Sequence, residues 1–305
     1  MSSFSSCLLA LMVAAQAAGP TDLVSYEVKP SDTDARITRF DNPHSVVFNR
    51  STPSSADLFV HMAGTGGVAA NRKEYLAIAA AQGYRAISLS YNNTPAVVAR
   101  CPRQVDPACS SDFRRERLFG ENVSEAIDDR PEESIINRLV KLLQHLDREH
   151  PGEEWASYLE GDGPDWERIA FGGHSQGAGM AAYLARQKKV ARVVLLSGPT
   201  DFLMDRSLAP WIDGPGATPA DRWYALYHQK EATASLIADA YRRLRIPESH
   251  VRMLTLEHVP FERTVANARV DFYHVSVYRW PFTPKSADGT AAYLPDWLFL
   301  VGRSR

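Results

Sequence analysis

The sequence lacks long runs of like charge, and it contains few cysteines. The formal net charge of the 305 residues is −2, and no long Lys/Arg tract occurs, so the electrostatic signature of a nucleic-acid or anionic-membrane binder is absent. The nine histidines show no His-x-x-x-His spacing, and no Cys/His ligand pattern is present, which excludes the common zinc motifs. We therefore expect neither a metal or cofactor site nor a nucleic-acid partner.

The amino-terminal segment lacks charge as well. Residues 1–18 contain no acidic or basic side chain, and an apolar stretch over residues 7–15 precedes Ala15-Gln16-Ala17. This small-x-small pattern predicts a signal peptide, residues 1–17, cleaved after Ala17. The apolar run has about half the length that a bilayer span needs, so we expect no transmembrane anchor. The sequence thus predicts a secreted protein, or a periplasmic one in a bacterium.

Only three cysteines are present, and one of them, Cys7, lies in the predicted signal. Its removal leaves Cys101 and Cys109, and an even pair close in sequence in an exported chain predicts one local disulfide. Three Asn-x-Ser/Thr sites occur, at Asn49, Asn92 and Asn122. Such sites fit surface positions of a secreted glycoprotein.

The remaining composition is that of a globular α/β domain. Hydrophobic residues make up 45% of the chain and charged ones 23%, which fits a single domain over residues 18–305. Strand and helix patterns alternate, as in a mostly parallel sheet flanked by helices. We expect strands near residues 24–29, 45–49, 57–61, 84–91, 168–171, 191–197, 222–228 and 251–256, and helices near 75–81, 131–146, 178–185 and 233–244. The segment 95–130 shows no clear period and is expected to be a disulfide-closed excursion above the sheet.

The most informative motif is Gly173-His174-Ser175-Gln176-Gly177. A Gly-x-Ser-x-Gly pattern between a strand and a helix is typical of a sharp turn that exposes a nucleophilic serine at the end of a sheet. The short apolar run 168–171 precedes it, and the small-residue segment 178–185 follows. The context predicts that Ser175 is a nucleophile.

A nucleophilic serine needs a histidine as base and a carboxylate to orient that histidine. In a strand-turn-helix hydrolase these partners follow the serine in the order acid, then base. Glu231, after the strand at 222–228, is the favoured acid, and Asp201 is the alternative. His258 and His274 are the two candidates for the base, and position alone slightly favours His258.

Backbone N–H groups must also stabilise the oxyanion that forms during acyl transfer. The amide of Gln176, directly after the nucleophile, is expected to supply one donor. The glycine-rich loop 64–67 is expected to supply the other, from Thr65 or Gly66, since glycine allows the backbone to approach a substrate closely.

On these motifs the chain resembles secreted α/β-hydrolases, and among them a group of exported hydrolases. That group carries a Gly-Thr-Gly-Gly oxyanion loop, two cysteines before an Arg-rich excursion and a Gly-His-Ser-Gln-Gly-Ala-Gly elbow; the similarity extends from about Leu58 to the end. In such proteins the catalytic histidine precedes a Ser-Val pair, as in His274-Val275-Ser276-Val277. The resemblance therefore favours His274 over His258. Glu231 stands where aspartate is usual, and Val275 where glycine is.

The predicted function is that of a serine esterase with small cap loops and a small-molecule or lipid-like ester as substrate. The segment 199–220 with Trp211, and Phe113 and Phe119, are expected to wall the cleft. One alternative is a non-catalytic binding protein of the same fold. The loop 64–69 also fits a dinucleotide fingerprint, but no acidic residue lies between Glu74 and Asp106 to hold a ribose, which disfavours an oxidoreductase.

Overall fold

A computed structural model describes residues 22–257, 271–279 and 282–302. The predicted signal peptide 1–17, with Cys7, and the alternative base His258 lie outside the described residues. Within the described part of the chain, no helix has the length and apolarity that a bilayer span requires.

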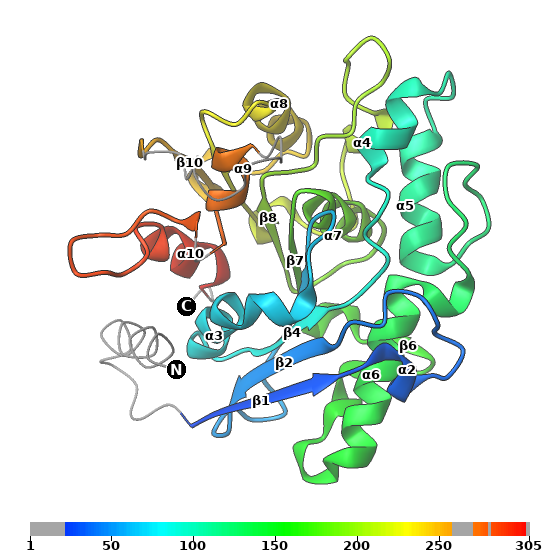
Figure 1. Cartoon of the computed structure of the whole chain (residues 1–305), viewed down its shortest axis with the longest axis vertical. Helices are drawn as coiled ribbons and strands as arrows, with labels where there is room; N and C mark the ends of the chain where they lie inside the picture. The colour runs from blue at the N-terminus through cyan, green and yellow to red at the C-terminus, as the bar shows by residue number, and fades with distance from the viewer. Residues whose placement is uncertain (1–21, 258–270, 280–281, 303–305) are drawn as a thin grey trace.

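A mixed, mostly parallel sheet forms the centre of the molecule (Figure 1). Its strands are β1 (Leu23–Val28), β2 (His44–Asn49), β3 (Leu58–Met62), β4 (Arg85–Leu89), β7 (Ile169–His174), β8 (Arg192–Leu196), β9 (Trp223–His228) and β10 (Val251–Leu254). The spatial order of the eight strands is β1-β2-β4-β3-β7-β8-β9-β10. Strand β2 runs antiparallel to β1 and β4, and every other neighbouring pair is parallel. This arrangement confirms the predicted α/β-hydrolase fold.

The central strands are apolar on both faces, as burial between two helical layers requires. In β8, Val193 and Leu195 contribute to one hydrophobic core, and Val194 and Leu196 to the other. Successive side chains of a strand point to opposite faces, so this continuous apolar run fills both cores.

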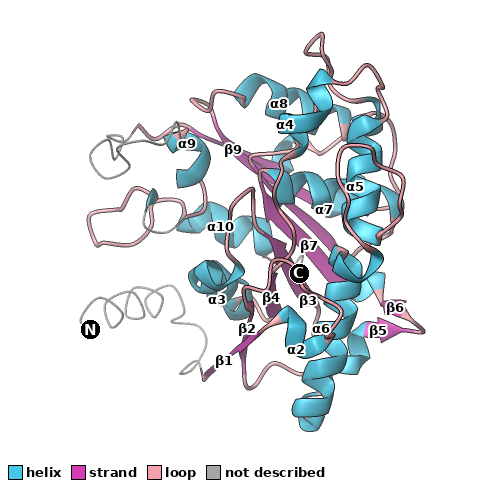
Figure 2. Cartoon of the chain, turned by 45° about the vertical axis from the view of Figure 1, so that its right-hand side comes forward, coloured by secondary structure: helices cyan, strands magenta, loops and turns pink. Residues whose placement is uncertain are grey.

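Helices cover both faces of the sheet (Figure 2). The larger core holds side chains of α5 (Cys109–Phe119), α6 (Ile135–Glu149), α7 (Gln176–Gln187) and α8 (Ala234–Arg243). The smaller core holds side chains of α3 (Lys73–Ala81) and α10 (Leu294–Val301). Short helices α2 (Pro30–Thr33), α4 (Val97–Arg100) and α9 (Phe272–Ser276) and a small β5 (Leu159–Glu160)–β6 (Gly163–Pro164) sheet complete the structure.

The segment 95–130 is more regular than the sequence predicts, since it contains α4 and α5. The apolar period of α5 is hidden because two of its buried side chains are arginines, Arg114 and Arg117, each of which pairs with a buried aspartate. Phe113, expected in a cleft wall, is fully buried in the core instead. The absence of a clear apolar period thus hid the helices α4 and α5 of this segment.

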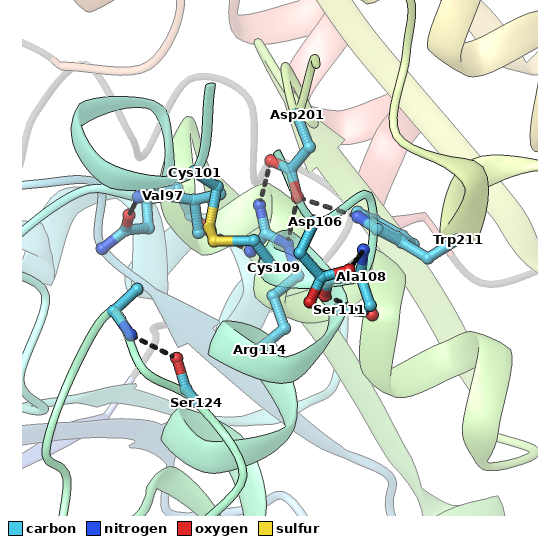
Figure 3. The surroundings of a disulfide bond; sticks show 12 residues. Val97, Cys101, Asp106, Ala108, Cys109, Ser111, Arg114, Ser124, Asp201 and Trp211 are labelled. Atoms are coloured by element: carbon cyan, nitrogen blue, oxygen red, sulfur yellow. Dashed lines mark hydrogen bonds and ion pairs between the residues drawn. A yellow bond between two sulfur atoms is a disulfide. The ribbon is translucent and has the colours of Figure 1, made fainter. Parts of the chain in front are cut away.

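The predicted disulfide is present and joins Cys101 to Cys109, the first residue of α5 (Figure 3). The predicted glycosylation sites differ in accessibility: Asn122 is exposed, Asn49 is half-buried and Asn92 is buried. The Asn92 amide donates a hydrogen bond to Asp129 in the interior. The expectation of a surface position was therefore wrong for Asn92.

Candidate active site

Ser175 occupies the turn between β7 and α7 with φ 55° and ψ −117°. The turn requires glycine on both sides of the serine. A Cβ on Gly173 would lie 2.3 Å from the carbonyl carbon of Gly177, and one on Gly177 would lie 2.0 Å from the carbonyl oxygen of Met62. The motif thus reflects the close approach of α7 to β7 and β3, and the strained backbone exposes the serine at the carboxyl end of the parallel strands.

His274 lies in α9, and its Nδ1 is 2.7 Å from Oε2 of Glu231. The buried Glu231 carboxylate also accepts hydrogen bonds at Oε1 from the Ser197 hydroxyl and the His228 N–H, both at 2.7 Å. An ionised carboxylate only accepts, so Nδ1 of His274 carries the proton. In the tautomer with this proton the lone pair resides on Nε2, the nitrogen with which such an imidazole can accept a proton.

Ser175 and His274 both line one cavity of about 320 Å³, together with the loop 64–67 and Val68. Glu231 contacts the far side of the His274 ring. The serine, histidine and glutamate favoured from the sequence thus converge from the ends of β7, α9 and β9. Along the chain they follow the order Ser175, Glu231, His274, which is the order of nucleophile, acid and base in this fold.

Asp201, the alternative acid, has different partners. Its carboxylate accepts two hydrogen bonds from Arg114, at 2.7 Å from Nε and 2.5 Å from Nη2, and a third from the Trp211 indole at 2.9 Å (Figure 3). Trp211, expected in a cleft wall, is instead half-buried against this ion pair. Arg114 also donates to the carbonyl of Gln176 at 3.4 Å. Asp201 therefore holds Arg114, which contacts the first turn of α7, and no hydrogen bond joins Asp201 to His274 among the described residues.

The N–H groups expected to stabilise the oxyanion differ in whether they already donate a hydrogen bond within the protein. Gln176 is the first residue of α7, so its N–H has no acceptor within the helix. In the loop 64–67, the Gly66 N–H donates to Oδ1 of Asn93 at 3.0 Å, and Nδ2 of Asn93 donates to the Gly67 carbonyl at 2.7 Å. Since Asn93 occupies the Gly66 amide, Thr65 is the candidate that this loop leaves for the second donor.

Two residues that the sequence reasoning missed hold the backbone of His274. Nε2 of His174 donates to the His274 carbonyl at 2.8 Å, and the His174 ring stacks on Tyr278 at 4.3 Å between centroids. The Asp271 carboxylate accepts from the His274 N–H at 3.2 Å and from the Ala232 N–H at 2.7 Å. The available signal was the position of His174 within the Gly-x-Ser-x-Gly motif, directly before Ser175.

Burial holds the pKa of His174 well below its ordinary value, and the nearby His274 lowers it further. His174 is therefore neutral near pH 7, with its proton on Nε2, because a carbonyl oxygen only accepts. A neutral donor can hold the His274 backbone without adding a positive charge beside the His274 ring.

The same geometry bears on the alternative chemistries. Over residues 22–257, 271–279 and 282–302, no group of three or more His, Cys, Asp or Glu side chains is placed to hold a metal ion. In the loop 64–67, the Gly66 and Gly67 amides donate to Asn93 and to the Gly64 carbonyl. These amides are the donors that a dinucleotide pyrophosphate would need, so the loop is a poor fit to that ligand.

Comparisons with known proteins identify no family for this chain. No protein-family model and no curated protein matches the sequence. A protein assigned as a dienelactone hydrolase of Klebsiella pneumoniae is 14% identical, with TM-score 0.43 over 92% of this chain and 98% of that one. Esterase B of Lactobacillus rhamnosis, inhibited by a tributyrin phosphonate, is 12% identical, with TM-score 0.41 over 84% of each chain. TT1662 of Thermus thermophilus is 14% identical, with TM-score 0.37 over 78% of this chain and 90% of that one.

Proposed function

We propose that this chain is an exported serine hydrolase that cleaves a carboxylic ester through an acyl-enzyme. The observation that carries the proposal is the 2.7 Å contact between His274 and the buried Glu231 at the cavity that Ser175 lines. A neutral imidazole oriented by a carboxylate and placed beside an elbow serine is the arrangement that activates a hydroxyl.

In the proposed reaction the Ser175 hydroxyl attacks the ester carbonyl while Nε2 of His274 takes its proton. Glu231 stabilises the imidazolium that forms, and the N–H groups of Gln176 and Thr65 donate to the oxyanion. The tetrahedral intermediate collapses, and His274 returns the proton to the leaving alcohol. Water then attacks the acyl-enzyme with His274 as base, which releases the acid and restores Ser175.

Labelling with a fluorophosphonate probe tests the nucleophile. We expect one label per chain in the wild type, on the peptide that contains Ser175, and none in Ser175→Ala. Hydrolysis of p-nitrophenyl esters of increasing chain length should be lost in the same variant. An unlabelled wild-type protein would instead support the alternative of a binding protein without catalysis, whereas label retained in Ser175→Ala would place the nucleophile elsewhere.

Export is the second part of the proposal, and the Cys101–Cys109 disulfide supports it because such bonds persist in oxidising compartments. Expression of the full chain in a secreting host should yield a mature protein that begins at Ala18. Amino-terminal sequencing of protein from the medium or periplasm measures this directly, and retention of Met1 in all of the protein would contradict it.

A further inference from the structure

The cavity beside Ser175 has two arginines in its wall. Arg72 ends the short 3₁₀ turn η1 (Ala69–Arg72), and Arg279 follows α9. Both line the same cavity as Ser175 and His274. Neither residue has a role in the acyl-enzyme chemistry described above, so the presence of two cations in this cavity wall requires another explanation.

Arg72 is buried, with 5% of its surface exposed. Its Nη1 donates to the carbonyl of Asn71 at 2.8 Å, and its guanidinium lies 5.0 Å from the ring centroid of Tyr278. Its buried Nε has no hydrogen-bond partner among the described residues, and no carboxylate of those residues pairs with it. A buried guanidinium without a counter-ion is costly to the fold.

Other buried arginines show how this protein normally compensates such a charge. Three form buried ion pairs, and two donate to backbone carbonyls of distant segments: Arg114 with Asp201, Arg117 with Asp129, Arg138 with Glu133, Arg85 with Thr52 and Glu153, and Arg192 with Phe299 and Leu300. Arg72 differs from these five in its partners: it donates to the carbonyl of its own neighbour Asn71 and contacts Tyr278, and among the described residues it has neither a carboxylate nor a distant carbonyl to accept from it.

Arg279 is half-buried and stacks on Phe282, with its guanidinium 4.8 Å from the ring centroid. It forms no ion pair within the described part of the chain, and the proximity of Arg72, after burial, lowers its pKa. A guanidinium remains charged at neutral pH in spite of such a shift. Two like charges therefore act on the same small cavity.

Asp271 is the acidic residue that lines this cavity, as far as the described residues extend. Its two carboxylate oxygens already accept the N–H groups of His274 and Ala232. Asp271 thus serves the backbone of α9, and the cavity keeps an excess of positive charge next to the nucleophile.

We propose that Arg72 and Arg279 form an anion subsite for a carboxylate of the substrate, so that the preferred esters carry an ionised carboxylate on their acyl or alcohol portion. The proposal rests on the proposed role of Ser175. A guanidinium group matches the planar geometry of a carboxylate, and the interaction between them is stronger in a partly desolvated cavity than in water. The substrate would supply the counter-ion that the protein does not.

Matched substrates test the charge preference. The first pair tests for a carboxylate on the acyl portion and consists of the p-nitrophenyl monoester of adipic acid and its distal methyl ester. The second pair tests for a carboxylate on the alcohol portion and consists of 4-carboxyphenyl butyrate and its methyl ester. Release of the phenol is measured in every case. We expect kcat/KM to be about 10- to 100-fold higher for the charged member of one pair, the size of a charge-assisted contact. A ratio near one in both pairs would overturn the anion subsite.

Variants assign the preference to the arginines. Arg279→Gln, at the half-buried position, should reduce the charged-to-neutral ratio by about tenfold, and Arg279→Lys should retain part of it. Arg148→Gln makes the same charge change on an exposed position of α6 and should leave the ratio at its wild-type value. An equal loss in Arg148→Gln would show a general field effect and would contradict a local subsite.

A binding measurement separates this proposal from that of the reaction. Adipate is titrated calorimetrically into wild type and Arg279→Gln, with inorganic phosphate as a second anion. Adipate binding that is lost in Arg279→Gln supports the subsite even if Ser175 takes no fluorophosphonate label. A labelled, ester-cleaving enzyme that neither binds adipate nor prefers charged esters refutes the subsite and leaves the hydrolase proposal intact. Binding of phosphate alone would refute carboxylate recognition.

Discussion

At the scale of single residues, Glu231 is the group whose function is most sharply testable. Glu231→Gln keeps the size of the side chain but replaces the Oε2 acceptor of His274 by an amide that favours the wrong tautomer of the ring. We expect kcat to fall by about 10²- to 10⁴-fold, with a smaller fall in Ser197→Ala, which removes only a neighbour of Oε1. Steady-state kinetics on a p-nitrophenyl ester measure both variants.

Asp201→Asn is the matched control, because it neutralises the other carboxylate weighed as the acid. This variant leaves Arg114 buried without its counter-ion, a loss of about 3–5 kcal/mol in unfolding free energy. The two variants should therefore differ in what they lose: Glu231→Gln should lose mainly kcat, and Asp201→Asn should lose mainly free energy of unfolding. A larger kcat loss in Asp201→Asn, in protein shown to be folded, would reverse the assignment.

Gly177 provides a second residue-scale prediction. A Cβ there would lie 2.0 Å from the Met62 carbonyl oxygen, and backbone atoms cannot move aside as a flexible side chain can. We expect Gly177→Ala to lower the free energy of unfolding by more than about 3 kcal/mol. In Gly152→Ala, where the added carbon meets nothing within 4 Å, the change should stay within about 0.5 kcal/mol. Urea denaturation compares the two, and equal stabilities would contradict the steric account.

Motif and chain order favoured Ser175 and Glu231 from the sequence, and the resemblance to exported hydrolases favoured His274 over His258. The sequence did not indicate Arg72 or Arg279. An arginine is ordinary at any single position, and only the tertiary structure shows that a given guanidinium has no carboxylate partner. The interaction of Asn93 with the Gly66 amide was hidden for the same reason, since it joins residues far apart in the chain.

At the scale of elements, the strands were predicted well and the helices less so. A buried parallel strand is a continuous apolar run, and β8 and β9 are of that kind. Helix α5 escaped notice because arginines and a glutamate take buried positions on it. Helix α10 was not predicted, although Leu294, Trp297 and Leu300 fill the smaller core.

The disulfide at the start of α5 gives a prediction at this scale. It closes a short loop, and chain-entropy arguments give such a bond about 2–3 kcal/mol of stabilisation. The double variant Cys101→Ser/Cys109→Ser should therefore unfold at a lower temperature than the wild type, and a reductant should lower the wild-type midpoint toward it. Thermal unfolding with and without dithiothreitol measures this, with the bond verified by mass spectrometry. A wild-type midpoint that stays constant after verified reduction would refute it.

At the scale of the whole molecule, buried neutral histidines set the response to acid. Burial lowers the pKa of His44 and of His61 to about 3, and burial also lowers that of His174. The unfolded chain binds these protons below about pH 6.5 and the folded one does not, so the stabilisation is complete above that pH and is lost as pH falls. For each fully buried histidine, the free energy of unfolding should fall by about 2 kcal/mol between pH 6.5 and pH 5.

Urea unfolding at pH 7, 6 and 5 measures this decline. His61→Phe is the informative variant, because both ring nitrogens of His61 lack a hydrogen-bond partner among the described residues and Tyr75 and Tyr278 surround the ring. Its loss of stability on acidification should be smaller than that of the wild type by the contribution of one histidine. Identical slopes in the two proteins would show that His61 is protonated in the folded state.

The contacts that hold His274 have a practical consequence for engineering. His174 and Asp271 form hydrogen bonds with the carbonyl and the N–H of residue 274, not with its ring. The backbone at this position therefore keeps these two hydrogen bonds whatever side chain it carries. A truncated position 274 would thus offer a ready-made vacancy between Glu231 and Ser175. Free imidazole added to such a protein has the Glu231 carboxylate to orient it, and in the proposed hydrolase it should restore activity to the truncated variant.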